Sequence, residues 1–260
     1  MRDIAIRPAR TQAELHACVA LQVQVWGFSD RDAVPFNQLH AAHEWGGQVL
    51  VAVDGTQVVG FCYGFAGKQR GRSVLCSHML AVLPEYRGRK VGVELKLAQG
   101  RWALQNGYDL ITWTYDPLEA LNANLNIGRL GGIVRQYLVN HYGDMQDGIN
   151  KGLPTDRMLL EWHLTRPTVQ RVLAGDDSGF SGTSAEPEES AGSVEAICEI
   201  PASIQRIKAT DPDLALRWRL RVREQLLAAL DRGLTVTGFR WTDGTGSYLL
   251  TREEEDRHAH

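Results

Sequence analysis

The stretch that decides the fold reads HMLAVLPEYRGRKVG and spans residues 78–92. It combines an apolar strand, a proline that ends the strand, a basic glycine-containing turn and a helix start. Apolar residues then recur at a spacing that places them on one helix face: Val91, Leu95, Ala98 and Trp102. The helix is expected to end at Asn106-Gly107, because glycine suits a left-handed C-terminal cap.

The turn before this helix is expected to bind phosphate. The first N–H groups of a helix lack intrahelical acceptors, and the helix dipole adds partial positive charge there. Arg87, Arg89 and Lys90 surround that point with full charges. Both the P-loop pattern and the Rossmann glycine pattern are absent. An ordinary basic surface turn is the alternative interpretation.

The stretch resembles the pyrophosphate loop of the GNAT superfamily of acyl-CoA N-acyltransferases. That loop reads Arg/Gln-x-x-Gly-x-Gly/Ala and follows a strand ending in Ala-Val-x-Pro-Glu. Arg87, Val91 and Gly92 fit its first, fifth and sixth places, and Gly88 takes the second. Lys90 stands in the fourth place instead of glycine, where its side chain could crowd the pyrophosphate or pair with it. The resemblance covers residues 1 to about 166 and is most specific between 78 and 132.

The resemblance implies an α/β (α+β) fold with a mixed, mostly antiparallel sheet flanked by helices. It also implies transfer of an acetyl or other short acyl group from acyl-CoA to a primary amine, with acetyl-CoA as cosubstrate and no metal. Asn122 corresponds to the opening of the family's last helix, and Asn126 could hydrogen-bond the CoA thiol. The residues expected to bind the pantetheine and the pyrophosphate are Leu80, Ala81, Val82, Arg87, Gly88, Arg89, Lys90, Val91 and Gly92.

His78 is the candidate general base, because an imidazole titrates near neutrality and can accept an amine proton. A strand histidine satisfied by a neighbour is the alternative. The family's thiolate-protonating tyrosine falls at Ile127, so this sequence departs from the family there. Tyr142 is the substitute chosen here, and Tyr115 and Tyr137 are the other substitutes if folding brings one close.

Glu44 is expected to line the acceptor cleft, beside a helical pair that often acts as a lid in the family. The run His40-x-x-His43-Glu44 also resembles a zinc motif. Both zincin spacings place the glutamate differently, and no third ligand is spaced nearby, so no metal site is predicted.

Elsewhere, alternation, capping and turn signals predict the other elements. Thr11-x-x-Glu14 is a capping box, and Asp54-Gly55 is a hairpin turn. The expected strands are 3–7, 49–53, 58–64, 74–82, 108–115, 133–142 and 158–164, and the expected helices are 11–22, 35–43 and 118–130.

Composition shifts divide the chain into four parts. Residues 1–166 form the acyltransferase domain, and residues 167–193 an acidic flexible linker whose composition cannot bury enough surface to order it. Residues 194–252 form a strand, a helix opened by Asp211-Pro212 and a hairpin, and 253–260 a polar tail. The C-terminal unit is expected to dock on the first domain or on a partner subunit.

The 260 residues carry a net charge of −3, which disfavours nucleic-acid binding. No signal peptide or membrane-crossing run is visible. The four cysteines lack Cys-x-x-Cys spacing and indicate reduced thiols, hence a cytoplasmic protein. The expected partners are acyl-CoA and an amine substrate, with a homodimer possible. A non-catalytic acyl-CoA-binding module whose C-terminal unit contacts a partner is the alternative function.

Overall fold

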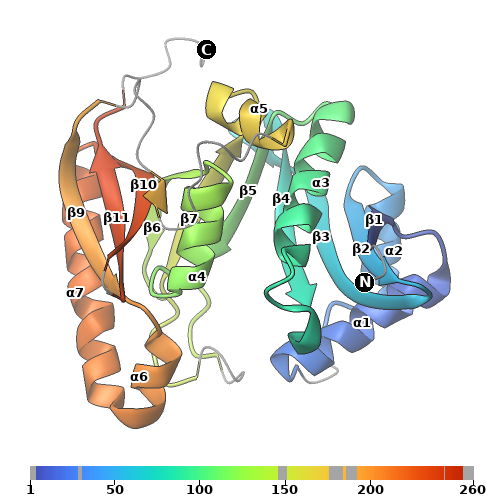
Figure 1. The fold of residues 1–260 in the computed structure, drawn as a ribbon, viewed down its shortest axis with the longest axis horizontal. Coiled ribbons are helices and arrows are strands. Elements are labelled where there is room, and N and C mark those ends of the chain that lie inside the picture. Colours follow the sequence, from blue (N-terminus) through green and yellow to red (C-terminus); the bar gives the residue numbers. More distant parts are fainter. Residues whose placement is uncertain are drawn as a thin grey trace. The chain divides into compact units, whose positions relative to one another are not determined.

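The computed structural model describes residues 4–28, 31–145, 151–175, 184–185, 192–242 and 244–253. The chain divides into two compact units, the first essentially Met1–Trp113 and the second the described residues from Thr114 onward. Figure 1 shows the elements of both units, coloured along the chain.

The first unit is built on five strands in the order β1-β2-β3-β4-β5. The first four pair antiparallel, and β5 pairs parallel to β4. The parallel pair is joined by helix α3, as a crossover requires. The bounds are β1 Ala5–Pro8, β2 Gln48–Asp54, β3 Gln57–Gln69, β4 Arg72–Val82, β5 Leu110–Tyr115, α1 Gln12–Trp26, α2 Phe36–Glu44 and α3 Val91–Gln105.

Local signals set the ends of these elements. The Thr11 hydroxyl accepts a hydrogen bond from the Glu14 N–H at 3.2 Å, so Thr11 caps α1 as predicted. The other half of the predicted capping box differs, because the Glu14 carboxylate accepts from the Arg10 N–H at 2.7 Å. Gly55 has φ 62° in the β2–β3 hairpin turn, and Gly107 has φ 79° after α3. Both are left-handed conformations that favour glycine. Helix α3 thus ends as the sequence predicted.

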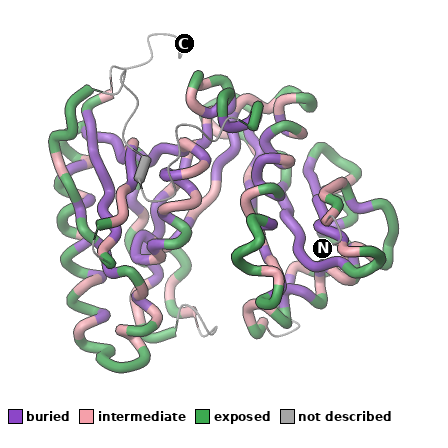
Figure 2. The backbone as a smooth tube through the Cα atoms, viewed as in Figure 1, coloured by how far each residue is buried: buried purple, intermediate pink, exposed green. Residues whose placement is uncertain are grey.

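The core of the first unit lies between the sheet and its helices, where Figure 2 shows buried backbone along β2 and β3. The buried face of α3 is wider than the predicted stripe. Val91 and Leu95 are buried, but Ala98 and Trp102 are only half-buried. The buried face also includes two polar residues, Lys96 and Gln99.

The second unit has strands in the order β7-β6-β10-β11-β9, with β8 beside β10. Strand β10 pairs with β6 at Val236 and Val134, so the C-terminal strands continue the sheet of β6 and β7. The bounds are α4 Ala120–Ala123, the π-helical η2 Asn124–Arg129, β6 Ile133–Leu138, β7 Arg157–His163, α5 Pro167–Leu173, β8 Ser184–Ala185, β9 Val194–Pro201, α6 Ile204–Thr210, α7 Pro212–Asp231, β10 Thr235–Thr242 and β11 Thr245–Thr251.

Several elements differ from the sequence-based expectation. Residues 167–173 of the predicted linker form α5, because Val169, Val172 and Leu173 bury one face of a short helix. Strand β6 stops at Leu138, four residues before the predicted end at Tyr142. The compact units divide at Trp113, whereas the predicted boundary was residue 166. Most of the predicted linker and residues 254–260 of the predicted tail lie outside the described residues.

The predicted fold class, a mixed and mostly antiparallel sheet flanked by helices, is confirmed. Within the described ranges, no helix combines the length and the apolar character that crossing a bilayer demands.

Candidate functional site

The basic turn leads from β4 into α3. A short 3-10 turn, η1 (Pro84–Tyr86), precedes it, and Arg87, Gly88, Arg89 and Lys90 are all exposed. Lys90 is the N-cap residue of α3, and no side chain caps the helix. The first N–H groups of α3 therefore lack both an intrahelical acceptor and a side-chain cap. With two arginines beside them, they form a cationic cradle suited to a phosphate.

The two departures from regular backbone in this turn occur at Gly88 and Lys90, with φ 77° and 61°. Lys90 adopts the left-handed conformation for which glycine is the usual residue, which explains physically why a glycine would suit that place. A Cβ added at Gly92 would approach Leu80 and Val82 no closer than 3.9 Å. A Cβ at Gly92 would thus make ordinary van der Waals contact with these two side chains without a clash.

Strand β4 carries a β-bulge at His78. Ser77 pairs with Gly64 and Met79 pairs with Tyr63, so His78 is an extra residue without a partner on β3. A bulge re-aims a side chain and frees backbone groups, and it is frequent beside active sites. The residues expected to contact pantetheine follow directly: Leu80 and Val82 are half-buried and Ala81 is buried.

The His78 ring lies exposed but against aromatic neighbours. Its centroid is 5.8 Å from the rings of both Tyr63 and Phe65. Partial burial among these rings lowers the pKa of His78 below its ordinary value of 6.5. The neutral imidazole, which can accept a proton, is therefore the main form at pH 7. The contacts that the described structure gives His78 are with the rings of Tyr63 and Phe65.

Beside the bulge lies a buried amine that sequence reasoning missed. Lys96 of α3 is 3% exposed, and its Nζ donates to Ser77 Oγ at 2.7 Å and to Gln99 Oε1 at 3.1 Å. Nζ also lies 3.5 Å from the centroid of the Trp113 ring. The sequence feature that could have pointed to this amine is the polar pair Lys96 and Gln99. The two residues are at i,i+3 spacing and lie next to Leu95 of the apolar stripe.

The buried tyrosines are poorly suited to protonate a thiolate. Burial raises the pKa of Tyr115, and the Tyr137 hydroxyl donates to Asp156 Oδ2 at 2.6 Å. Burial and that hydrogen bond raise the pKa of Tyr137 as well. Ile127, at the place of the family's tyrosine, is 1% exposed and belongs to the core.

Tyr142 follows β6 and is 49% exposed. Its hydroxyl is 2.8 Å from Thr114 Oγ1, and the Arg157 guanidinium lies 5.2 Å from its ring centroid. Asn122 is exposed, whereas Asn126 is 4% exposed in the π-helical turn. Tyr142, Asn122 and Asn126 all belong to the second unit, so their roles stay predictions.

Glu44 is exposed at the end of α2. Gln38 of the same helix donates to the Tyr63 hydroxyl at 3.4 Å, and the Tyr63 ring in turn contacts the His78 ring. The His40 ring stacks on Phe36 with centroids 5.6 Å apart. Among the described residues, no three potential metal ligands cluster together, so His40 and His43 gain no third ligand.

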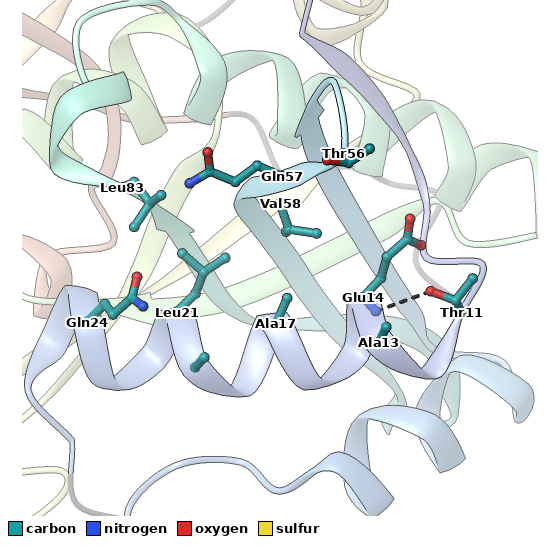
Figure 3. A pocket seen from close by; sticks show the side chains of 11 residues that line it. Thr11, Ala13, Glu14, Ala17, Leu21, Gln24, Thr56, Gln57, Val58 and Leu83 are labelled. Atoms are coloured by element: carbon teal, nitrogen blue, oxygen red, sulfur yellow. Dashed lines mark hydrogen bonds between the residues drawn. The ribbon is translucent and has the colours of Figure 1, made fainter.

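The first unit also has a groove of 460 Å³ between α1 and the start of β3. Figure 3 shows Leu21, Ala17 and Glu14 along α1 facing Val58 and Gln57, with Leu83 at one end. Its one carboxylate, Glu14, is already bonded to Arg7 at 2.6 Å. None of the predicted catalytic or CoA-binding residues lines this groove, so it is not assigned to them.

A comparison with protein families identifies the region that contains the basic turn. Residues 45–125 match the family model described as acetyltransferase (GNAT) domain. A comparison with curated protein sequences finds no relative of this chain.

Three solved structures share the fold. One chain of the NatC complex bound to Gag peptide and CoA aligns with a TM-score of 0.52 and 19% identity, and the alignment covers 64% of this chain and 100% of that chain. A putative acetyltransferase of the GNAT family from Desulfovibrio desulfuricans aligns with a TM-score of 0.51 and 13% identity, over 63% of this chain and 100% of that chain. An N-acetyltransferase from Staphylococcus aureus aligns with a TM-score of 0.50 and 16% identity, over 63% and 99%. At these identities the likeness concerns the fold.

Proposed function

Because residues 45–125 match the acetyltransferase (GNAT) domain model, we propose that this chain transfers an acetyl or other short acyl group from acyl-CoA to a primary amine. The observation that supports this most is the bulge at His78, in the strand that leads directly into the cationic turn. One strand thus provides both a phosphate cradle at its end and a candidate base at its irregular point.

In this proposal the pyrophosphate binds the turn from Arg87 to Gly92 through the exposed amides and guanidinium groups. The pantetheine lies along Leu80, Ala81 and Val82 and brings the thioester to the bulge. Holding the thioester beside the amine converts a bimolecular reaction into a local one. His78 accepts the amine proton, directly or through water, and its lowered pKa keeps it in the base form at neutral pH. Glu44 borders the amine.

CoA binding is tested with Gly92→Asp and the neutral control Gly92→Asn, by calorimetry. Either side chain has room, since an added Cβ meets nothing closer than 3.9 Å. An acidic residue in the first turn also suits the helix dipole, so the fold survives. Loss of CoA binding in Gly92→Asp but not in Gly92→Asn is expected. Equal affinity in all three proteins would contradict the placement of the pyrophosphate.

The base is tested with His78→Ala in an amine panel. Turnover is expected to fall by about 10²-fold with CoA affinity little changed. In the unmodified protein, kcat/KM is expected to rise with pH through the pKa of His78, below 6.5, and then level off. Equal rates, or an unchanged rise in His78→Ala, would remove His78 as the base.

A non-catalytic acyl-CoA-binding module is the second candidate. It is favoured by Ile127, which is buried where the family has its acid, and by the C-terminal strands that extend the sheet of β6. This candidate predicts tight CoA binding with no acetyl transfer to any amine in a broad panel. Turnover of one amine at enzymatic rates would exclude it.

A further inference from the structure

Lys96 is a buried cation that no described carboxylate neutralises. It is 3% exposed, and among the described residues only burial and Cys62 act on its pKa. Burying an ammonium ion without a counter-charge costs several kcal/mol. A core methionine would fill the same volume without that cost, so the buried charge indicates a function.

The position of this charge is specific. The pairs between β4 and β5 are Leu75 with Ile111 and Cys76 with Thr112. The next residues in that register are Ser77 and Trp113, and both contact the Lys96 ammonium. The amine therefore lies at the point where the described pairing of the two strands ends. Ser77 is also the residue immediately before the bulge at His78.

The contacts leave this amine one weakly engaged N–H. An ammonium has three N–H bonds, and the Ser77 hydroxyl and the Gln99 carbonyl accept two of them. Nζ lies 3.5 Å from the centroid of the Trp113 ring, so the remaining contact of the ammonium is with a π-face and not with an oxygen. A sulfur atom that arrived beside the bulge could take that third N–H while the other two bonds held the amine in place.

Among the described residues, the titratable group that acts on Lys96 is Cys62 on β3. Burial raises the pKa of the Cys62 thiol, so it stays neutral. The residues of β4, β5 and α3 that contact Nζ are Ser77, Trp113 and Gln99, none of which titrates or carries charge. Burial lowers the pKa of Lys96 to about 8. The ammonium is therefore charged at neutral pH and able to give up its proton.

We propose that Lys96 is a catalytic residue that stabilises and protonates the departing CoA sulfur. This inference rests on the proposed acetyl transfer. As the amine nitrogen forms its bond to the carbonyl carbon, the carbon–sulfur bond breaks and its electron pair goes to sulfur. The Lys96 ammonium donates its proton to that sulfur and becomes a neutral amine. The proton lost by the substrate amine goes to His78, and solvent reprotonates Lys96 after CoA leaves.

A fixed positive charge in a dry site is effective against charge that develops in the reaction. Lys96 would thus act as the general acid in place of the family's tyrosine, whose position is taken by Ile127 in this sequence. The proposal also accounts for the buried charge, because a preorganised ammonium must be desolvated before the thiolate forms.

The test compares the full-length protein with Lys96→Met and with Lys68→Met, which makes the same chemical change at an exposed lysine of β3. Thiolate absorbance of bound CoA is titrated against the same protein bound to desulfo-CoA. The bound thiol is expected to have a pKa lowered by about one unit or more in the unmodified and Lys68→Met proteins. This lowering should disappear in Lys96→Met, together with about a tenfold or greater loss of kcat.

Lys96→Met removes a buried charge and is expected to fold, which a urea titration checks; Lys96→Gln is the second variant if it does not. An unchanged thiol pKa in a Lys96 variant that binds CoA would overturn the role of Lys96 while leaving the proposed function intact. Absence of CoA binding in the unmodified protein would overturn both.

Discussion

Tyr86 donates its phenolic hydrogen to the Asp54 carboxylate over 2.9 Å, and this bond ties the basic turn before α3 to the β2–β3 hairpin. The Arg89 guanidinium lies 4.9 Å from the centroid of the same ring. Tyr86 therefore fixes the backbone of the turn, because it is a residue of η1, and its ring contacts Arg89, one of the cations of the turn.

Removing that bond should weaken CoA binding without harming the fold. Tyr86→Phe keeps the ring under Arg89 but frees the turn, so the dissociation constant of CoA is expected to rise roughly two- to fivefold. Calorimetry measures it. Tyr108→Phe is the matched control, because it loses a similar bond, to the Gly46 carbonyl at 2.7 Å, outside the turn. The same rise in both variants would show that the tie to Asp54 has no special role.

Lys90 tests the cost of a left-handed residue in the basic turn. With φ at 61°, Lys90→Gly should relieve steric strain and raise the free energy of unfolding by up to about 1 kcal/mol. Lys90→Ala keeps a Cβ and removes the same charge, so it should bring no such gain. Urea unfolding measures both. A gain in Lys90→Ala equal to that in Lys90→Gly would assign the effect to charge instead of backbone conformation.

Glu14 should make the free energy of unfolding depend on pH in the acidic range. Its hydrogen bond with Arg7, opposed by burial, lowers the pKa of Glu14 from 4.5 to about 2. Because the folded pKa is the lower one, the stabilisation is complete above pH 4.5 and disappears as the pH falls toward 2. Allowing for solvent screening, Glu14→Gln should cost about 1–2 kcal/mol at pH 6.5 and almost nothing near pH 2. A difference from the unmodified protein that does not shrink in acid would contradict this.

Asp116 and Arg219 form a buried ion pair in the second unit, with Arg219 Nη2 2.5 Å from Asp116 Oδ2. Asp116→Asn leaves a buried guanidinium without its counter-charge, so it should destabilise the protein by about 3 kcal/mol or more. Asp109→Asn removes a charge from the exposed pair with Arg72 and should cost less than about 1 kcal/mol. Chemical unfolding of the two variants measures the contrast. Similar small losses would show that Arg219 finds another partner.

The elements that the sequence predicted well are those fixed by neighbouring residues. The Thr11 cap, the Gly55 turn and the end of α3 before Gly107 depend on interactions within a few residues, and each lies where it was predicted. The strand, basic turn and helix of residues 78–92 were predicted for the same reason. The helix α5 was missed because its short apolar face, Val169 and Val172, is stabilised by packing on other parts of the chain.

What the sequence by itself determined is thus the strand–turn–helix unit with its cationic turn, because caps, turns and helix periodicity are local properties. Only the tertiary structure decided that His78 lies in a bulge, since the bulge exists through the register with Tyr63 and Gly64 of another strand. The same holds for Lys96, which becomes a buried cation only when α3 packs on Ser77 and Trp113. The local pattern marked Lys96 and Gln99 as a polar pair, but their burial depends on residues distant in sequence and becomes visible only in the tertiary structure.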